Sequence, residues 1–113
     1  MTPKLTTHVL DTATGRPAAG MKLALYRGPN LLTEAVTNSD GRLDNPLLQG
    51  DALTPGEYRI EFQVGAYFAA TAHPDARKFL DIVPVVFLIT DPSRSYHIPL
   101  LVSPWAYNTY RGS

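Results

Sequence analysis

Apolar and polar residues alternate along short stretches of this chain, and turn residues separate the stretches. In the clearest stretch, EYRIEFQV, one face carries Tyr58, Ile60, Phe62 and Val64, and the other carries charged or amide side chains. A period of two residues is that of a β-strand with one buried and one wet face. Turn clusters such as TGRPAAG, NSDG and TDPSRS recur between the stretches, which is typical of an antiparallel β-sandwich or barrel.

The same pattern predicts six further strands and one helix. The strands are expected at residues 5–11, 21–26, 31–37, 82–90, 96–102 and 106–111. The helix is expected at residues 67–79, YFAATAHPDARKF, where Pro74 would end or kink it. The Asp-Gly pair of SDGR predicts a type I′ hairpin turn, after which Arg42 begins a strand. With 113 residues and no linker, the chain fits a single domain, residues 1–113.

The segment IVPVVFLIT interrupts the alternation because it is apolar on both faces. Pro84 lacks a backbone donor, so this segment fits an edge strand better than a central one. Its outer face is covered either by the short helix or by another subunit. The aromatic-rich strand at residues 106–111 could likewise pair with a copy of itself.

Composition narrows the class of partner. Ten Lys and Arg residues balance ten Asp and Glu residues, which removes the electrostatic basis for binding nucleic acid or an anionic membrane. The expected partner is a small molecule or another protein. Cysteine is absent, so disulfides and thiolate chemistry are excluded. Because we find neither a signal-peptide core nor an apolar run near the roughly 20 residues of a membrane span, we expect a cytoplasmic protein.

Two of the three histidines are expected on the polar faces of strands. In LTTHVLD, His8 lies on the face opposite Val9, and in YHIPLLV, His97 lies on the face opposite Ile98. Two imidazoles held on rigid strands suit proton transfer near neutral pH, whereas a single strand histidine is usually only a polar residue on a wet face. Their spacing matches no zinc or copper pattern, so no metal is expected.

Arg42 and the tail are further candidates. Arg42 offers a planar fork of donors for a carboxylate or for the oxygen edge of a flat heterocycle, although alone it would be a solvated charge beside a turn. The chain closes on SPWAYNTYRGS, which contains Tyr110, Arg111 and Ser113. Chain ends usually fray, so a tail this rich in aromatic, cationic and hydroxyl groups is either a loose end or part of a site.

Three motifs together resemble a known family. THVLDTATGRPAAG, TNSDGR and YHIPLLVSPWAYNTYRGS occur in order and closely resemble the 5-hydroxyisourate hydrolases, the enzyme branch of the transthyretin-like family. The VLD and GRPA segments and the SP pair are shared with hormone-carrying transthyretins and concern the fold. The resemblance to the enzyme branch lies in His8, Arg42, His97 and the terminal YRGS. Many relatives carry a histidine where this chain has Ser95, so a helper role there is not carried over.

The resemblance implies an all-β, transthyretin-like antiparallel sandwich of two sheets, with seven to eight strands and one short helix. It also implies a homotetramer, a dimer of dimers joined through edge strands, with active sites in the channel between dimers. The implied reaction is hydrolysis of 5-hydroxyisourate to 2-oxo-4-hydroxy-4-carboxy-5-ureidoimidazoline in urate degradation, with no metal or organic cofactor.

The resemblance also implies roles for individual residues. Either His8 or His97 would activate water, and the other would hold the water or protonate the leaving nitrogen. Arg42 would bind the substrate and stabilise negative charge. Ser113 would be a catalytic residue that accepts or donates hydrogen bonds at the substrate edge, Tyr110 would line the pocket or donate its hydroxyl, and Arg111 would form part of the pocket wall. The competing class is a non-catalytic carrier of a small aromatic ligand, which has no need for two imidazoles, an arginine and YRGS together.

Overall fold

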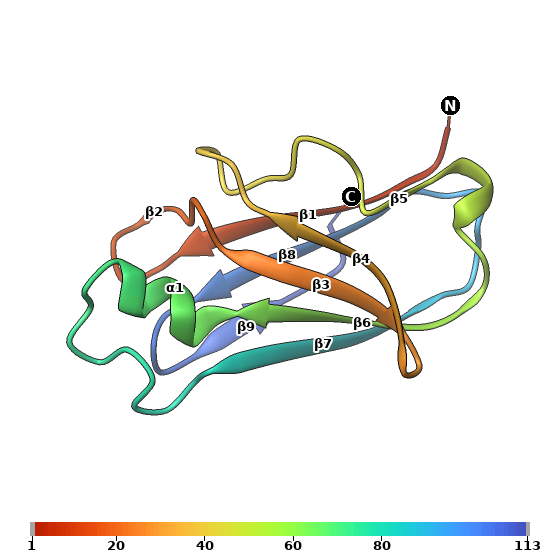
Figure 1. The fold of residues 1–113 in the computed structure, drawn as a ribbon. Helices are drawn as coiled ribbons and strands as arrows, with labels where there is room; N and C mark the ends of the chain where they lie inside the picture. The colour runs from red at the N-terminus through yellow and green to blue at the C-terminus, as the bar shows by residue number, and fades with distance from the viewer. Residues whose placement is uncertain (1, 113) are drawn as a thin grey trace.

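The computed structural model describes residues 2–112, which form two stacked β-sheets and one short α-helix (Figure 1). One sheet has the order β2-β1-β8-β9, with β5 also pairing with β1, and the other has the order β4-β3-β6-β7. The predicted all-β sandwich is therefore confirmed. The bounds are β1 (Lys4–Asp11), β2 (Arg16–Pro17), β3 (Lys22–Arg27), β4 (Asn30–Val36), β5 (Leu48–Gln49), the 3₁₀ turn η1 (Gly50–Ala52), β6 (Gly56–Gln63), α1 (Val64–Ala70), β7 (Ile82–Ile89), β8 (Tyr96–Val102) and β9 (Tyr107–Thr109).

The core lies between the sheets and follows the predicted alternation. In β6, Tyr58, Ile60 and Phe62 are at most 1% exposed. Burying one large apolar side chain stabilises the fold by about 1.5–3 kcal/mol relative to leaving it in water. The facing strands contribute further buried side chains, among them Leu5, Val9, Leu23, Leu25, Val83, Val85, Ile98 and Leu100. The strand predicted from EYRIEFQV is thus confirmed, except that Val64 already belongs to the helix.

The helix begins earlier and is shorter than predicted. It spans Val64–Ala70 instead of residues 67–79. The chain leaves helical geometry at Ala72, whose φ is +57°, and the amide of His73 donates to the carbonyl oxygen of Phe68 at 3.0 Å. This bond satisfies an unpaired carbonyl at a helix end. The prediction for residues 71–79 was wrong because the backbone ends the helix before Pro74 is reached.

The SDGR turn also differs from its prediction. The amide of Asn38 donates to the carbonyl oxygen of Arg42 at 2.7 Å, and the carbonyl oxygen of Asn38 accepts the amide of Gly41 at 2.9 Å. Of the three loop residues between them, Gly41 alone has a positive φ, +73°, whereas a type I′ turn needs two. The connection is therefore a three-residue loop. Arg42 forms an isolated bridge with His8 instead of starting a strand.

β1 and β8 pair in parallel, which departs from the predicted antiparallel arrangement. Alternation predicts which face a residue takes but not the direction of a strand, and no hairpin turn joins these two segments. The register pairs Thr6 with His97 and His8 with Pro99. Both histidines therefore emerge on the same outer face of this sheet.

β7 is an edge strand, as Pro84 predicted. Its alternate residues Val86 and Leu88 are 57% and 59% exposed, so neither α1 nor another described segment covers this outer face. β9, which is shorter than the predicted strand 106–111, forms an edge of the other sheet. Figure 1 shows the two edges on the same side of the sandwich.

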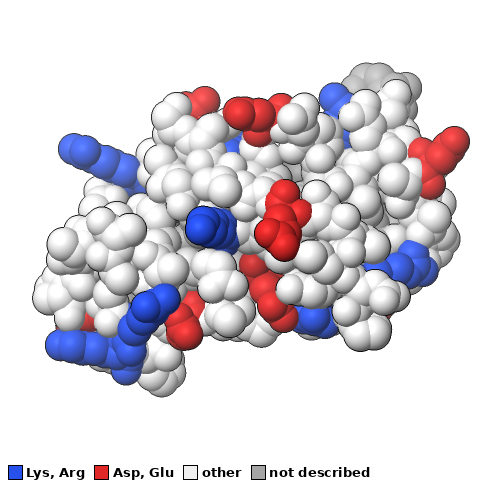
Figure 2. Space-filling view, viewed as in Figure 1, with Lys and Arg blue, Asp and Glu red and all other residues white. Residues whose placement is uncertain are grey.

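Charged side chains are mixed on the face seen in Figure 2, where Lys and Arg alternate with Asp and Glu and no large patch of one sign forms. This distribution agrees with the balanced composition of the chain. Within residues 2–112, no helix has the length and apolar character that a membrane span requires.

We expect the stability of the fold to require a glycine at position 41, because this residue packs closely against β1. An added Cβ would lie 2.3 Å from the carbonyl oxygen of Val9, whereas at Gly15, with a nearly equal φ of +74°, it would meet nothing within 4 Å. We predict that Gly15→Ala lowers the free energy of unfolding by about 1–2 kcal/mol, and that Gly41→Ala lowers it by at least about 3 kcal/mol because overpacking adds to backbone strain. Chemical denaturation measures both losses, and equal losses would contradict the close approach.

Candidate functional site

The candidate site lies on the outer face of the sheet that contains β1, β8 and β9. An isolated bridge pairs His97 with Gly112 and continues the β8–β9 register, which places Tyr110 opposite Pro99. The pairing therefore sets two neighbouring rows of residues across the sheet. One row holds Thr6, His97 and Gly112, and the next holds Arg42, His8, Pro99 and Tyr110.

A cavity of about 390 Å³ opens on this face, lined by Lys4, Thr6, Arg42, Ser95 and His97. Its volume lies within the range of roughly 300–1,000 Å³ that is common for small-molecule sites. Lys4 and Arg42 supply positive charge, and the other three side chains supply hydroxyl or imidazole groups. The cavity suits a small polar ligand with several oxygen atoms.

His97 is held from two sides. Its Nδ1 lies 2.8 Å from Oγ1 of Thr6, and its carbonyl oxygen accepts the amide of Gly112 at 2.7 Å. A Cβ on Gly112 would lie 2.5 Å from Cδ2 of the His97 ring, so a glycine is required against the imidazole. The glycine of the YRGS tail therefore fits a close packing contact with a candidate catalytic side chain.

The electrostatic surroundings of His97 favour its neutral form. Burial lowers the pKa of His97 below its ordinary value of 6.5, and the nearby charges of Arg42 and His8 lower the pKa further. Lys4 adds a cation to the same cavity. A neutral imidazole can accept a proton from a bound group at neutral pH.

His8 and Arg42 are neighbours because the loop before Arg42 is fastened to β1. The amide of Val9 donates to the carbonyl oxygen of Gly41 at 2.8 Å, and the bridge between His8 and Arg42 follows at the next position. His8 lies in the row beside His97 and does not line the cavity itself. The structure thus brings His8, Arg42 and His97 together on one face.

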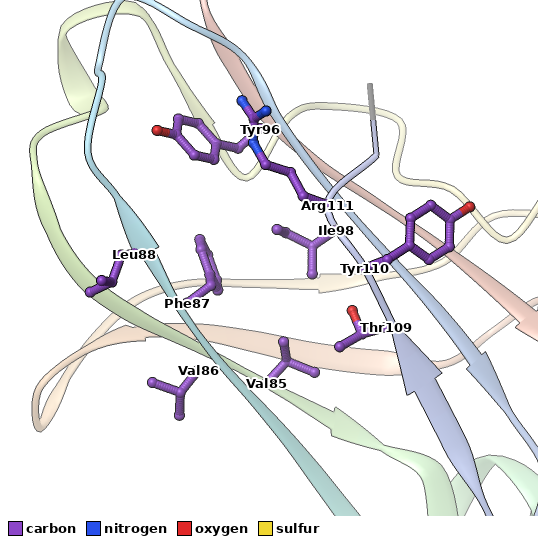
Figure 3. Close-up of a pocket in the computed structure, with 9 residues that line it drawn as sticks. All are labelled: Val85, Val86, Phe87, Leu88, Tyr96, Ile98, Thr109, Tyr110 and Arg111. Carbon is purple, nitrogen blue, oxygen red and sulfur yellow. The ribbon is translucent and has the colours of Figure 1, made fainter.

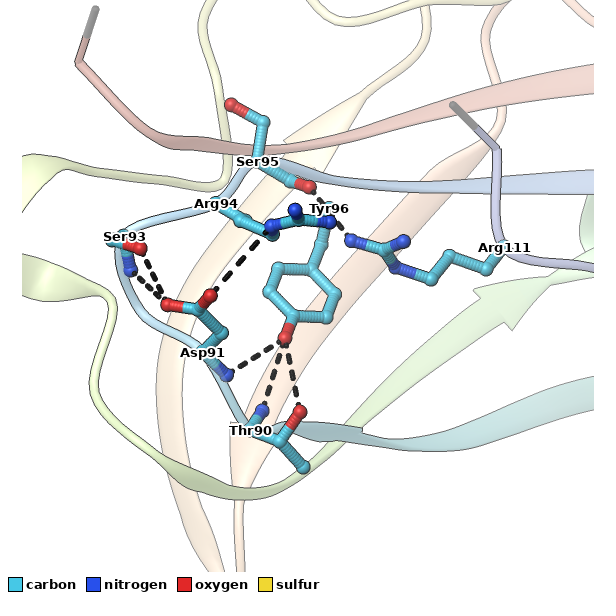
Figure 4. A network of polar contacts seen from close by, with 7 residues as sticks. All are labelled: Thr90, Asp91, Ser93, Arg94, Ser95, Tyr96 and Arg111. Atoms are coloured by element: carbon cyan, nitrogen blue, oxygen red, sulfur yellow. Dashed lines mark hydrogen bonds and ion pairs between the residues drawn. The ribbon is translucent and has the colours of Figure 1, made fainter.

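Arg111 points to the other side of the sheet. The register places it opposite Ile98, which faces the core. Its guanidinium lies 4.6 Å over the ring of Tyr96 and donates to the carbonyl oxygen of Ser95 at 3.3 Å (Figure 4). The hydroxyl of Tyr96 accepts the amides of Thr90 and Asp91, both at 3.0 Å. Arg111 is therefore not brought together with the histidines, and it anchors the tail instead.

The two remaining candidates in the tail are Tyr110 and Ser113. Tyr110 is 57% exposed and lies on the outer face in the row of His8. Ser113 lies outside the described residues. Tyr110 and Arg111 also border a second cavity of about 210 Å³ between β7 and the tail, and its lining is mainly apolar (Figure 3). That lining contains no histidine or carboxylate.

Sequence reasoning gave no role to four residues of the site, namely Lys4, Thr6, Ser95 and Gly112. Thr6 shares a face with His8 by alternation, but only the β1–β8 pairing shows that it contacts His97. Among residues 2–112, no group of three or more His, Asp or Glu side chains is placed to hold a metal ion.

The profile of the HIUase/Transthyretin family matches residues 5–112. The chain belongs to this family. A 5-hydroxyisourate hydrolase of Halalkalibacterium halodurans is 50% identical over 119 aligned positions, which cover 100% of both chains. The aligned region includes all the candidate site residues.

Several solved structures share the fold. The 5-hydroxyisourate hydrolase of Klebsiella pneumoniae has a TM-score of 0.85 and 32% identity, with 98% of this chain and 99% of that chain covered. Sea bream transthyretin in complex with thyroxine has a TM-score of 0.84 and 27% identity, with 96% and 94% covered. An (S)-allantoin synthase has a TM-score of 0.92 and 45% identity over 99% of this chain, which spans only 44% of that longer chain.

The titration of His97 is expected to depend on Arg42. We predict that NMR titration gives His97 a pKa below 6.5. Arg42→Gln should raise this pKa toward 6.5 without reaching it, because burial, the larger cause, remains. Arg16→Gln removes the same charge opposite Asp11, at the far end of β1, and should leave the titration unchanged. A pKa at or above 6.5 in the unmodified protein would show that the ring is not buried among cations as described.

Proposed function

We propose that this chain is a 5-hydroxyisourate hydrolase, which converts 5-hydroxyisourate to 2-oxo-4-hydroxy-4-carboxy-5-ureidoimidazoline in urate degradation. The observation that carries the proposal is the convergence of His97 and Arg42 on one cavity beside His8. The end-to-end similarity to a protein of that name supports it independently.

The reaction needs a base, an oxyanion partner and an acid. An imidazole takes a proton from water as the water oxygen bonds to a ring carbonyl carbon, which gives a tetrahedral oxyanion. The oxyanion then collapses, the ring C–N bond breaks, and the leaving nitrogen takes a proton while a carboxyl group forms. Histidines on rigid strands suit both proton transfers.

Arg42 is proposed to bind the substrate and stabilise the oxyanion. Its guanidinium stays charged at any working pH and offers a planar fork of donors to neighbouring oxygens. Its backbone is held beside His8, and its exposed side chain lines the cavity that His97 also borders. Such preorganised donors are the main source of transition-state stabilisation in many hydrolytic enzymes.

The tail is proposed to close the site. Tyr110 contributes a wall on the outer face, and Ser113 donates or accepts a hydrogen bond at the substrate edge. The contact of Arg111 with Tyr96 supports a role in anchoring the tail and not in touching the substrate. No metal or organic cofactor takes part in the proposed chemistry.

We further propose a cytoplasmic, single-domain protein of residues 1–113 that assembles as a homotetramer of two dimers. The exposed apolar side chains of β7 and the aromatic edge at β9 support pairing of copies through these strands. The outer face that carries the histidines would then lie between the dimers, where assembly excludes water from the cavity.

The alternative is a carrier of a small aromatic ligand, as in the thyroxine complex of the more distant sea bream transthyretin. A carrier does not require a neutral histidine beside an arginine. The polar lining of the cavity at His97 and Arg42 therefore favours the hydrolase.

The test is the ultraviolet decay of 5-hydroxyisourate generated freshly from urate by urate oxidase. We predict that the protein accelerates the decay and that Arg42→Ala lowers kcat by about a hundredfold or more, the usual cost of losing an oxyanion donor. Arg42→Lys keeps the charge without the planar fork and should recover only part of the rate.

Arg16→Ala is the matched control because it removes an exposed arginine at the distant end of β1. Its kcat should equal that of the unmodified protein. If the unmodified protein leaves the spontaneous decay rate unchanged, the hydrolase proposal fails.

A further inference from the structure

Thr6 makes the one side-chain hydrogen bond that reaches the His97 ring within residues 2–112. Its Oγ1 lies 2.8 Å from Nδ1, and both residues lie at paired positions of β1 and β8. The contact is therefore built into strand pairing and does not depend on a mobile loop. The ring nitrogen Nε2 has no hydrogen-bond partner in the described part of the chain.

The ring cannot easily turn away from this contact. Gly112 packs against Cδ2 so closely that even a methyl group would not fit. The imidazole is thus held between the threonine on one side and the tail backbone on the other. Such double support is what a proton-transferring side chain needs to keep one orientation.

A neutral histidine carries its proton on one ring nitrogen, and the partner of the other nitrogen decides which. A threonine hydroxyl can donate or accept, so the distance alone leaves two arrangements. If Thr6 donated to Nδ1, Nε2 would carry the proton and His97 could not take a proton from water through its free nitrogen. If Thr6 accepts from Nδ1–H, Nε2 keeps a lone pair for that purpose.

We propose that Thr6 is a positioning residue that accepts the Nδ1 proton of His97 and so makes Nε2 the general base, an assignment whose catalytic part rests on the proposed hydrolase function. The geometry favours this arrangement because Thr6 occupies Nδ1, while Nε2 has no hydrogen-bond partner among residues 2–112 and the ring borders the cavity. The charged or titratable side chains facing the ring are His8 and Lys4 from β1 and Arg42 from the loop fastened to β1. All of them disfavour an imidazolium, which agrees with a resting neutral base.

A hydroxyl suits this position better than a carboxylate. A carboxylate at residue 6 would also accept from Nδ1, but its negative charge would raise the pKa of His97 and attract Arg42 and Lys4. A neutral acceptor orients the ring without adding charge. Thr6 therefore fixes the tautomer of His97 without raising its pKa, whereas an acidic partner would affect both.

The test compares Thr6→Val, which replaces the hydroxyl with a methyl group of similar size, with Thr6→Ser, which keeps it. The first readout is the pair of ¹⁵N chemical shifts of the His97 ring, measured without substrate above the pKa. We expect the proton on Nδ1 in the unmodified protein and in Thr6→Ser, and a shift of population to Nε2 in Thr6→Val. A proton on Nε2 in the unmodified protein, or an unchanged tautomer in Thr6→Val, would overturn the proposal.

Thr7→Val is the matched control. Thr7 is the next residue of β1, and its hydroxyl donates to the carbonyl oxygen of Ile98 at 2.6 Å on the buried face. This variant should lose stability but keep the His97 tautomer. A tautomer change in Thr7→Val would mean that loss of any hydroxyl in β1 disturbs the His97 ring, and it would contradict the assignment of this role to Thr6.

The second readout is the rate of 5-hydroxyisourate decay. Thr6→Val should lower kcat by roughly tenfold to a hundredfold with little change in KM, by analogy with the loss caused by removing the partner that orients a metal-bound histidine. Full kcat in Thr6→Val would remove the catalytic part of the proposal. If the unmodified protein shows the Nδ1 proton yet hydrolyses nothing, the proposed function fails while the role of Thr6 in the tautomer stands.

Discussion

The parallel pairing of β1 with β8 is the constraint on which the candidate site depends. These strands come from opposite ends of the chain, and their register alone places Thr6 beside His97 and His8 in the neighbouring row. A shift by one residue would turn one histidine toward the core, because successive side chains of a strand face opposite sides. The inner faces of the same strands bury Leu5, Val9 and other core residues, so the packing that stabilises the sandwich also keeps the register.

Two further segments attach to this strand pair by backbone hydrogen bonds. The loop that carries Arg42 is fastened to the outer side of β1, and the tail is fastened to β8 at His97. Both attachments need a glycine, Gly41 in the loop and Gly112 in the tail, since a Cβ would meet the neighbouring strand at either position. The site is thereby assembled from three distant parts of the sequence with little freedom left in the backbone.

Much of this arrangement follows from the sequence. Alternation places His8 and His97 on outer faces, and the DGR and YRGS motifs single out Arg42 and the tail. Alternation also requires Tyr110 and Arg111 to face opposite sides, but it does not say which faces the core. The direction of β1 relative to β8, the contact of Thr6 and the packing of Gly112 depend on pairing between remote segments, which local pattern does not encode. The end of the helix and the SDGR loop were mispredicted because backbone hydrogen bonds set both: the amide of His73 bonds to Phe68 before Pro74 is reached, and Asn38 bonds to Arg42 around three loop residues.

The most direct test of the central claim is a double-mutant cycle on kcat for 5-hydroxyisourate decay with His8→Gln, His97→Gln and the double variant. If the strand pairing makes the two histidines one catalytic unit, the double variant should lose about as much rate as the worse single variant, since residues that act together are not additive. Losses that multiply would mean that the histidines act independently, and they would contradict the account.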